Sequence, residues 1–187
     1  MPVPVPGVNQ WIRPSLVSVP DTSAVKICTL PRGTRAQLGG MTWLGTENFN
    51  GLSGMPPGVQ SDFTSTCNPG RTGMNATDPI HIFAFWPHMH FLGRNMRSVV
   101  NRANGTVEEV FNQPFDFNQQ IHYDASVDLY PGDTITTTCT FFNDTTASVA
   151  YGSSTNSEMC YQFAFSTPAG ALTNGVFGLN GANNDCW

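Results

Sequence analysis

Short segments in which apolar and polar residues alternate recur through most of the chain, with glycine, proline or asparagine between them. No window keeps a period of 3.6 residues, so helices are not expected. Alternation with a period of two is typical of strands that bury one face. The pattern predicts strands over Ala24–Leu30, Gly40–Leu44, Ile80–Trp86, Val107–Phe111, Gln119–Leu129, Thr134–Phe142, Ser148–Tyr151 and Glu158–Phe165.

Turn signals such as Gly39-Gly40, Asn104-Gly105 and Pro131-Gly132-Asp133 separate these segments. We therefore expect an all-β fold, an antiparallel β-sandwich or jelly roll of about eight strands. Residues 1–20 contain five prolines and predict an extended leader or interdomain linker. Residues 21–187 are then expected to form one domain.

Charge argues against a nucleic-acid-binding function, and the distribution of apolar residues argues against a membrane span. The chain has 13 acidic and 8 basic residues, and the basic ones are scattered, so no nucleic-acid surface is expected. No apolar run approaches the roughly 20 residues that span a bilayer. The start, MPVPVPGVNQ, lacks a basic segment followed by an apolar one, so no signal peptide is predicted within this chain.

The five cysteines are widely spaced and include no CxxC pair, which argues against a zinc knuckle or a thioredoxin-like motif. Disulfides are the better interpretation. They imply an oxidising compartment, so a secreted or periplasmic protein is expected.

Two stretches carry candidate chemistry. In IHIFAFWPHMHFLGR (80–94), His88 and His90 are two residues apart, so on an extended chain both imidazoles lie on one face and Met89 on the other. Such a pair is a common metal half-site, although two half-exposed polar residues at a strand end would have the same spacing.

In GSSTNSEMCYQFAF (152–165), Met159 and Tyr161 share one face and Cys160 the other. A methionine beside aromatic residues is often core filler. Two imidazoles with a thioether, however, suit a copper ion that cycles between Cu(I) and Cu(II).

These stretches resemble the His-x-His strand and the Met-ligand strand of the copper type II ascorbate-dependent monooxygenases, the family of peptidylglycine α-hydroxylating monooxygenase and dopamine β-monooxygenase. PGDTITTTCTF (131–141) resembles the family's Gly-Asp strand with its cysteine. SAVKICTLPRGTRAQLGGMTWL and MPPGVQSDFTSTC are similar to its lead-in strands. The resemblance covers 21–186 and is to the C-terminal, oxygen-binding copper domain.

The resemblance implies a set of roles for named residues. It implies one copper ion, with His88, His90 and Met159 as its ligands. It also implies disulfides Cys139–Cys160 and Cys67–Cys186, with Cys28 unpaired. The first disulfide is expected to join the strand that carries Met159 to its neighbour.

The family's activity is hydroxylation of an aliphatic or benzylic C–H bond with O₂ and electrons derived from ascorbate. The family enzymes have a second, N-terminal copper domain that supplies an electron, and this chain has no room for it. His81 and His122 are expected to make local hydrogen bonds rather than a second site, with His81 on the opposite strand parity to His88.

Substrate recognition is expected to differ from that of the peptide enzyme. Trp86 stands where that enzyme has an arginine, and Tyr161 and Phe163 follow the methionine where it has an asparagine and a tyrosine. Trp86, Tyr161 and Phe163 are therefore pocket candidates for a small molecule or peptide less anionic than a peptide carboxylate.

Three alternatives stay open. One is a copper-binding or carrier module without turnover, and another is a β-sandwich with incidental histidines. The third is a cupin-like metal enzyme, since a His-x-His pair followed by Pro-Gly-Asp is also a cupin pattern. Cupins add a glutamate and a later histidine, where this chain has Gly93-Arg94 and Thr138-Cys139.

Overall fold

The structure is a computed structural model that describes residues 3–4, 11–12, 24–31, 33–35, 37–69 and 79–172. The chain divides into two compact units, Met1–Thr34 and Arg35–Trp187. In the first unit, β1 (Val3–Pro4) pairs with β2 (Trp11–Ile12) in antiparallel fashion. The prediction of a strand over Ala24–Leu30 is wrong. These residues are exposed and pair with none of the described strands. A strand-like sequence forms a strand only where a neighbouring strand and a buried face are available.

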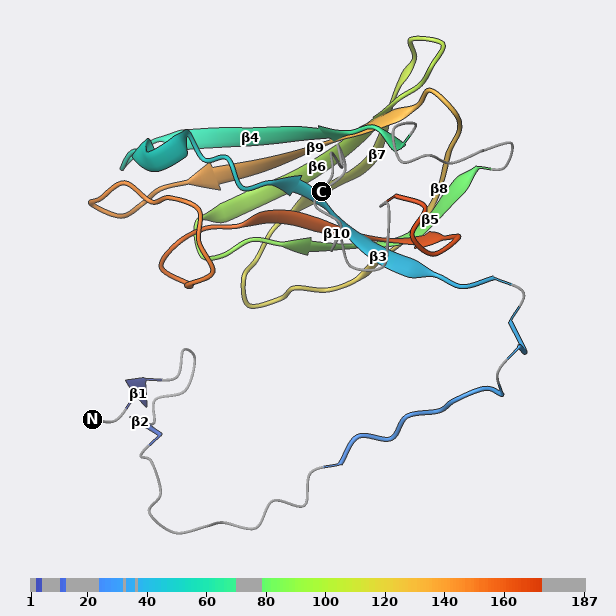
Figure 1. Cartoon of the computed structure of the whole chain (residues 1–187). Coiled ribbons are helices and arrows are strands. Elements are labelled where there is room, and N and C mark those ends of the chain that lie inside the picture. Colours follow the sequence, from blue (N-terminus) through green and yellow to red (C-terminus); the bar gives the residue numbers. More distant parts are fainter. Residues whose placement is uncertain are drawn as a thin grey trace. The chain divides into compact units, whose positions relative to one another are not determined.

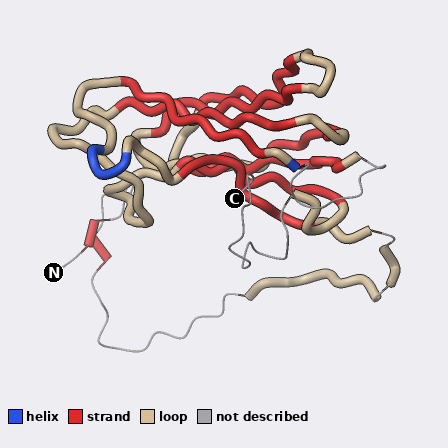
Figure 2. The backbone as a smooth tube through the Cα atoms, turned by 45° about the horizontal axis from the view of Figure 1, so that its top comes forward, coloured by secondary structure: helices blue, strands red, loops and turns tan. Residues whose placement is uncertain are grey.

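The second unit is a sandwich of two four-stranded antiparallel sheets (Figure 1). The first sheet has the order β3 (Gly40–Thr46), β10 (Cys160–Thr167), β5 (Ile80–His88) and β8 (Tyr123–Leu129). The second has the order β4 (Gln60–Cys67), β9 (Thr134–Phe142), β6 (Gly93–Asn101) and β7 (Val107–Pro114). Figure 2 shows the two layers of strands edge-on, with a short 3₁₀ turn, Gly51–Ser53, at one end.

The eight strands pair in a nested way: the first with the last, the second with the seventh, the third with the sixth and the fourth with the fifth. Between the sheets lies a core of aliphatic, aromatic and sulfur-containing side chains, of which the largest fully buried ones are Phe49, Phe85, Phe141, Leu44, Met55, Ile82, Met89, Met96, Leu129, Ile135 and Leu172. The expected all-β, disulfide-stapled sandwich of about eight antiparallel strands is confirmed.

The predicted strand set was incomplete. β4 and β6 were not expected, because their polar positions outnumber the apolar ones: Phe63 and Cys67 are the buried side chains of β4. The segment predicted over Ser148–Tyr151 forms only isolated bridges, from Val149 to Met55 and from Tyr151 to Glu158.

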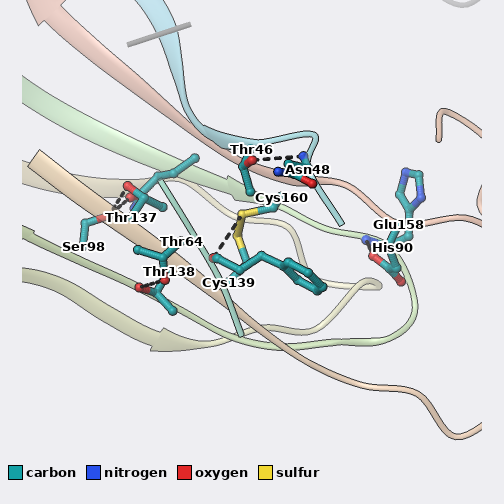
Figure 3. The surroundings of a disulfide bond; sticks show 12 residues. Thr46, Asn48, Thr64, His90, Ser98, Thr137, Thr138, Cys139, Glu158 and Cys160 are labelled. Carbon is teal, nitrogen blue, oxygen red and sulfur yellow. Dashed lines mark hydrogen bonds between the residues drawn. A yellow bond between two sulfur atoms is a disulfide. The ribbon is translucent and has the colours of Figure 1, made fainter. Parts of the chain in front are cut away.

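A disulfide joins Cys139 in β9 to Cys160 at the start of β10, with Cα atoms 5.8 Å apart (Figure 3). These strands belong to different sheets, so the bond ties the layers together across the core. The expected pairing of Cys139 with Cys160 is confirmed, and the neighbour to which it joins β10 lies in the facing sheet. Cys28 is a free, exposed cysteine, and Cys186, the partner predicted for Cys67, lies outside the described residues.

Within the described part of the chain, no helix has the length and apolar character needed to cross a bilayer.

Asp133, in the turn before β9, is a buried carboxylate that supports the end of the sandwich. It accepts hydrogen bonds from the N–H groups of Tyr130 (3.0 Å) and Ala103 (2.9 Å) and pairs with Arg102 (2.8 Å). Burial acts to raise its pKa, but the Tyr130 N–H, the Arg102 guanidinium and the Ala103 N–H outweigh burial, and the pKa lies below its ordinary 3.8.

We expect Asp133→Asn to lower the free energy of unfolding by about 2 kcal/mol at neutral pH, because charged hydrogen bonds to a buried group are lost. A lowered native pKa stabilises the fold above the ordinary aspartate pKa, and this stabilisation disappears as pH falls through the native value. Denaturant unfolding of both proteins should therefore show a gap at neutral pH that closes in acid. An equal gap at both pH values would contradict this role for the Asp133 charge.

Candidate functional site

His88 and His90 lie where β5 ends and the chain turns toward β6. His88 is the last residue of the strand and is half-buried, whereas His90 follows it and is 4% exposed. Met89 between them is fully buried in the core. The two ring centroids are 5.4 Å apart with the rings nearly perpendicular, so the imidazoles are brought together as the His-x-His spacing predicted.

The ring of His88 is oriented by Gln120, from the connection between β7 and β8. His88 Nδ1 lies 2.8 Å from Gln120 Oε1. The amide nitrogen of Gln120 donates to the carbonyl of Phe117 at 3.2 Å, which fixes Oε1 as the atom that faces the ring. Since Oε1 can only accept, His88 Nδ1 carries the proton and donates it.

The ring of His90 is oriented by the main chain of the segment before β10. His90 Nδ1 lies 2.8 Å from the carbonyl oxygen of Ser157. A carbonyl oxygen only accepts, so His90 Nδ1 is also the protonated nitrogen.

The neutral tautomer with the proton on Nδ1 presents an unprotonated Nε2, which is the form of histidine that binds a metal ion. Burial lowers the pKa of His88; the hydrogen bond that His88 donates to Gln120 opposes that shift and the nearby His90 adds to it. The net lowering keeps His88 in the neutral, metal-binding form at neutral pH.

Met159 lies immediately before β10, rather than within the strand as expected, and is half-buried. In the ladder between β10 and β5, Tyr161 is opposite His88. His88, the last residue of β5, and Met159, immediately before β10, therefore lie at the same end of this pair of antiparallel strands.

Glu158 is a buried carboxylate, 1% exposed, that lies just before β10 and bonds the turn after β5. Its oxygens accept the N–H groups of His90 at 2.8 Å and Leu92 at 2.6 Å. The adjacent N–H of Met159, like these two, acts to lower its pKa. Figure 3 shows Glu158 next to His90. Burial raises the pKa of Glu158, and the three N–H groups and His90 only partly offset this rise.

The outer face of the first sheet is aromatic beside the histidines. Phe163 lies opposite Trp86 in the ladder, with ring centroids 5.6 Å apart, and its centroid is 6.1 Å from that of His88. Trp86 Nε1 donates to the carbonyl of Gln120 at 3.3 Å. The three pocket candidates, Trp86, Tyr161 and Phe163, thus share a face with His88.

One carboxylate lies at the edge of this aromatic face. Glu47 accepts hydrogen bonds from the hydroxyls of Tyr151 and Tyr161, which also lie 2.6 Å from each other. Burial raises the pKa of Tyr161, and its bonds to Glu47 and Tyr151 raise it further. Tyr161 therefore stays protonated and is held by a local network.

The other two histidines lie apart from the pair. His81 bonds Asp128 at 2.8 Å, as expected. The expected opposite parity of His81 and His88 was wrong, because a β-bulge between Ile82 and Ala84 inserts one residue and returns both histidines to the outer face.

The ring of His122 lies between those of Trp86 and Phe165, at centroid distances of 4.7 and 5.3 Å. No group of three or more histidine, cysteine, aspartate or glutamate side chains able to hold a metal ion occurs within the described residues.

Sequence reasoning missed the residues that orient the pair: Gln120, Ser157 and Glu158. Each contacts its histidine over 32 to 68 residues of separation, which no local pattern reveals. The one available signal was an acidic residue, Glu158, at the start of a segment otherwise predicted to be a buried strand.

Comparison with known proteins identifies the family to which this sandwich domain belongs. Residues 38–169 match the family described as copper type II ascorbate-dependent monooxygenase, C-terminal domain. The chain is also similar to the DBH-like monooxygenase protein 1 of Homo sapiens and of Gallus gallus, with 31% identity over 128 and 129 residues. Each alignment covers 64% of this chain and only 21% of the relative. The matched range contains both sheets and all three predicted ligands, and the chain belongs to the family of the C-terminal domain of copper type II ascorbate-dependent monooxygenases.

Proposed function

We propose that this domain binds one copper ion through His88 Nε2, His90 Nε2 and the thioether of Met159. The observation that carries the proposal is that both Nδ1 atoms donate to fixed oxygen acceptors, Gln120 Oε1 and the Ser157 carbonyl. Hydrogen bonds of this kind select the tautomer and orientation of metal-binding histidines.

The donor chemistry fits copper. The described residues show no group of three or more histidine, cysteine, aspartate or glutamate side chains able to hold a metal ion, which supports a third protein donor of another kind, the Met159 thioether. Imidazole with thioether suits copper better than zinc or non-haem iron. The cupin-like alternative needs a carboxylate and a third histidine beside the pair, and the described residues offer no such group.

We infer that the domain is the oxygen-activating part of a monooxygenase that hydroxylates an aliphatic or benzylic C–H bond. When bound, copper would supply one-electron transfer and O₂ chemistry. The chain's own residues orient the two rings through their Nδ1 atoms, so that Nε2 of each neutral ring would face the metal. Ascorbate is the expected source of electrons, and an N-terminal copper domain is the proposed partner.

The substrate face is formed by Trp86, Phe163 and Tyr161. It is aromatic, and the one carboxylate beside it, Glu47, is engaged by two tyrosine hydroxyls. The aromatic rings of this face favour a small molecule or peptide with an apolar group near the reacting carbon.

A copper titration tests the site. Cu(I) added to the apo protein against a coloured Cu(I) chelator should be retained at one equivalent per chain, and Zn(II) should compete poorly because a thioether is a poor zinc ligand. Retention of no copper, or displacement of Cu(I) by equimolar Zn(II), would reject the proposed donor set.

The alternative of a copper carrier without turnover would use the same proposed ligands, His88, His90 and Met159. Oxygen and ascorbate consumption separate the two functions. Hydroxylated product formed by the copper-loaded chain would reject the carrier. Copper transfer to an acceptor protein, without O₂ uptake when an external electron donor is supplied, would reject the monooxygenase.

The Cys139–Cys160 disulfide supports an oxidising compartment for the domain, and we propose that the protein is secreted or periplasmic.

The nested strand pairing of the sandwich supports its description as a jelly roll.

A further inference from the structure

Glu158 is a buried carboxylate whose partners are main-chain N–H groups rather than the side chain of an arginine or lysine. Oε2 accepts from His90 N and Oε1 from Leu92 N, so both oxygens bond one turn of chain. A buried charge is costly unless its hydrogen bonds are satisfied. An ordinary core position would hold an apolar side chain, so this carboxylate has a specific local task.

The Glu158 carboxylate joins two segments that are far apart in the sequence. One is the turn after β5, which carries His90, and the other is the segment before β10, which carries Met159. Met159 directly follows Glu158 in the chain, and the carbonyl of Ser157, which precedes Glu158, accepts a hydrogen bond from His90 Nδ1. Residues 157–159 therefore contact both proposed ligand segments at once.

The main chain of Glu158 is itself fixed. Its N–H donates to the carbonyl of Ala150 and its carbonyl accepts from Gly152, at 3.1 Å each, in a parallel bridge between Tyr151 and Glu158. The backbone of Glu158 is thus held by two hydrogen bonds, and its carboxylate reaches from there to the turn that carries His90.

We propose that Glu158 is a positioning residue that sets the separation between the imidazole of His90 and the thioether of Met159, and so determines whether sulfur completes the Cu(I) site. This inference rests on the proposed copper site. Glu158 does not itself bind the metal, since both of its oxygens are engaged by N–H groups.

The test compares Glu158→Gln with the unaltered protein. A glutamine keeps the shape but has one accepting oxygen, so either the His90 or the Leu92 N–H would face an amide donor. We expect Cu(I) affinity to fall by about 10- to 100-fold, as for other residues that orient metal ligands. X-ray absorption should show the nitrogen shell retained and the sulfur shell weakened or lost.

Asp133→Asn is the matched control, because Asp133 is also a buried carboxylate that accepts two main-chain N–H groups, and it has no contact with the histidines. It should lower thermal stability while leaving Cu(I) affinity and the sulfur shell unchanged. If Glu158→Gln does not fold, Glu158→Asp serves instead, since it keeps the charge but is too short to bond both N–H groups.

A folded Glu158 variant with the unaltered Cu(I) affinity and sulfur shell would overturn the inference. This outcome is distinct from failure of the proposed function, in which the unaltered protein itself would show no copper or no sulfur shell. A loss of stability alone, equal to that of Asp133→Asn and without a change at the metal, would also overturn it.

Discussion

His88→Ala is expected to abolish tight copper binding while the sandwich stays folded. The substitution removes one of two imidazoles whose Nδ1 atoms donate to Gln120 and Ser157, which leaves Nε2 of each neutral ring to face the metal. Loss of a partner that merely orients a ligand costs about 10- to 100-fold in metal affinity, so loss of the ligand itself should cost at least about 100-fold. Competition with a Cu(I) chelator measures the change directly.

Stability should change little in this variant, because His88 is half-buried at a strand end and makes one side-chain hydrogen bond, which is worth about 1 kcal/mol. His122→Ala is the matched control: its ring packs on Trp86 on the same face, yet it is no part of the proposed ligand set. Equal copper affinity in His88→Ala and His122→Ala would contradict the proposed site.

The second large effect concerns the disulfide between the sheets. Replacing Cys139 and Cys160 together by alanine should lower the free energy of unfolding by roughly 3 kcal/mol, the value for closing a loop of 21 residues. For a domain of this size, such a loss corresponds to a Tm lower by about 6–12 °C. Chemical denaturation and calorimetry measure the two quantities.

Cys28→Ala is the control for this substitution, because Cys28 is free and exposed. It should leave Tm unchanged. A double variant as stable as Cys28→Ala would show that the sandwich does not depend on its covalent tie, and the packing of Phe49, Phe63 and Phe141 would then have to hold the layers together near the disulfide.

The sequence predicted the fold class well, because alternation with a period of two is a local property that the sandwich preserves. It missed β4 and β6, whose inward positions hold few large apolar residues, so the pattern was weak. It wrongly predicted Ala24–Leu30 as a strand, because a strand needs a neighbour that only the tertiary structure supplies.

The spacing of His88 and His90 indicated a metal half-site, whereas Met159 became a candidate ligand through the resemblance to the copper monooxygenases. The residues that orient them were not. Gln120 and Glu158 are common polar residues in the sequence, and their roles depend on hydrogen bonds to histidines more than 30 residues away. The bulge between Ile82 and Ala84 likewise changed a parity that counting residues had fixed.

The central claim is that Met159 completes a copper site with His88 and His90. X-ray absorption at the copper edge of the Cu(I)-loaded protein measures this directly. The account predicts nitrogen scatterers together with one sulfur scatterer in the unaltered protein. In Met159→Ala, it predicts that both the sulfur shell and tight Cu(I) binding are lost. A site with nitrogen scatterers alone in the unaltered protein, or an unchanged sulfur shell in Met159→Ala, would contradict it.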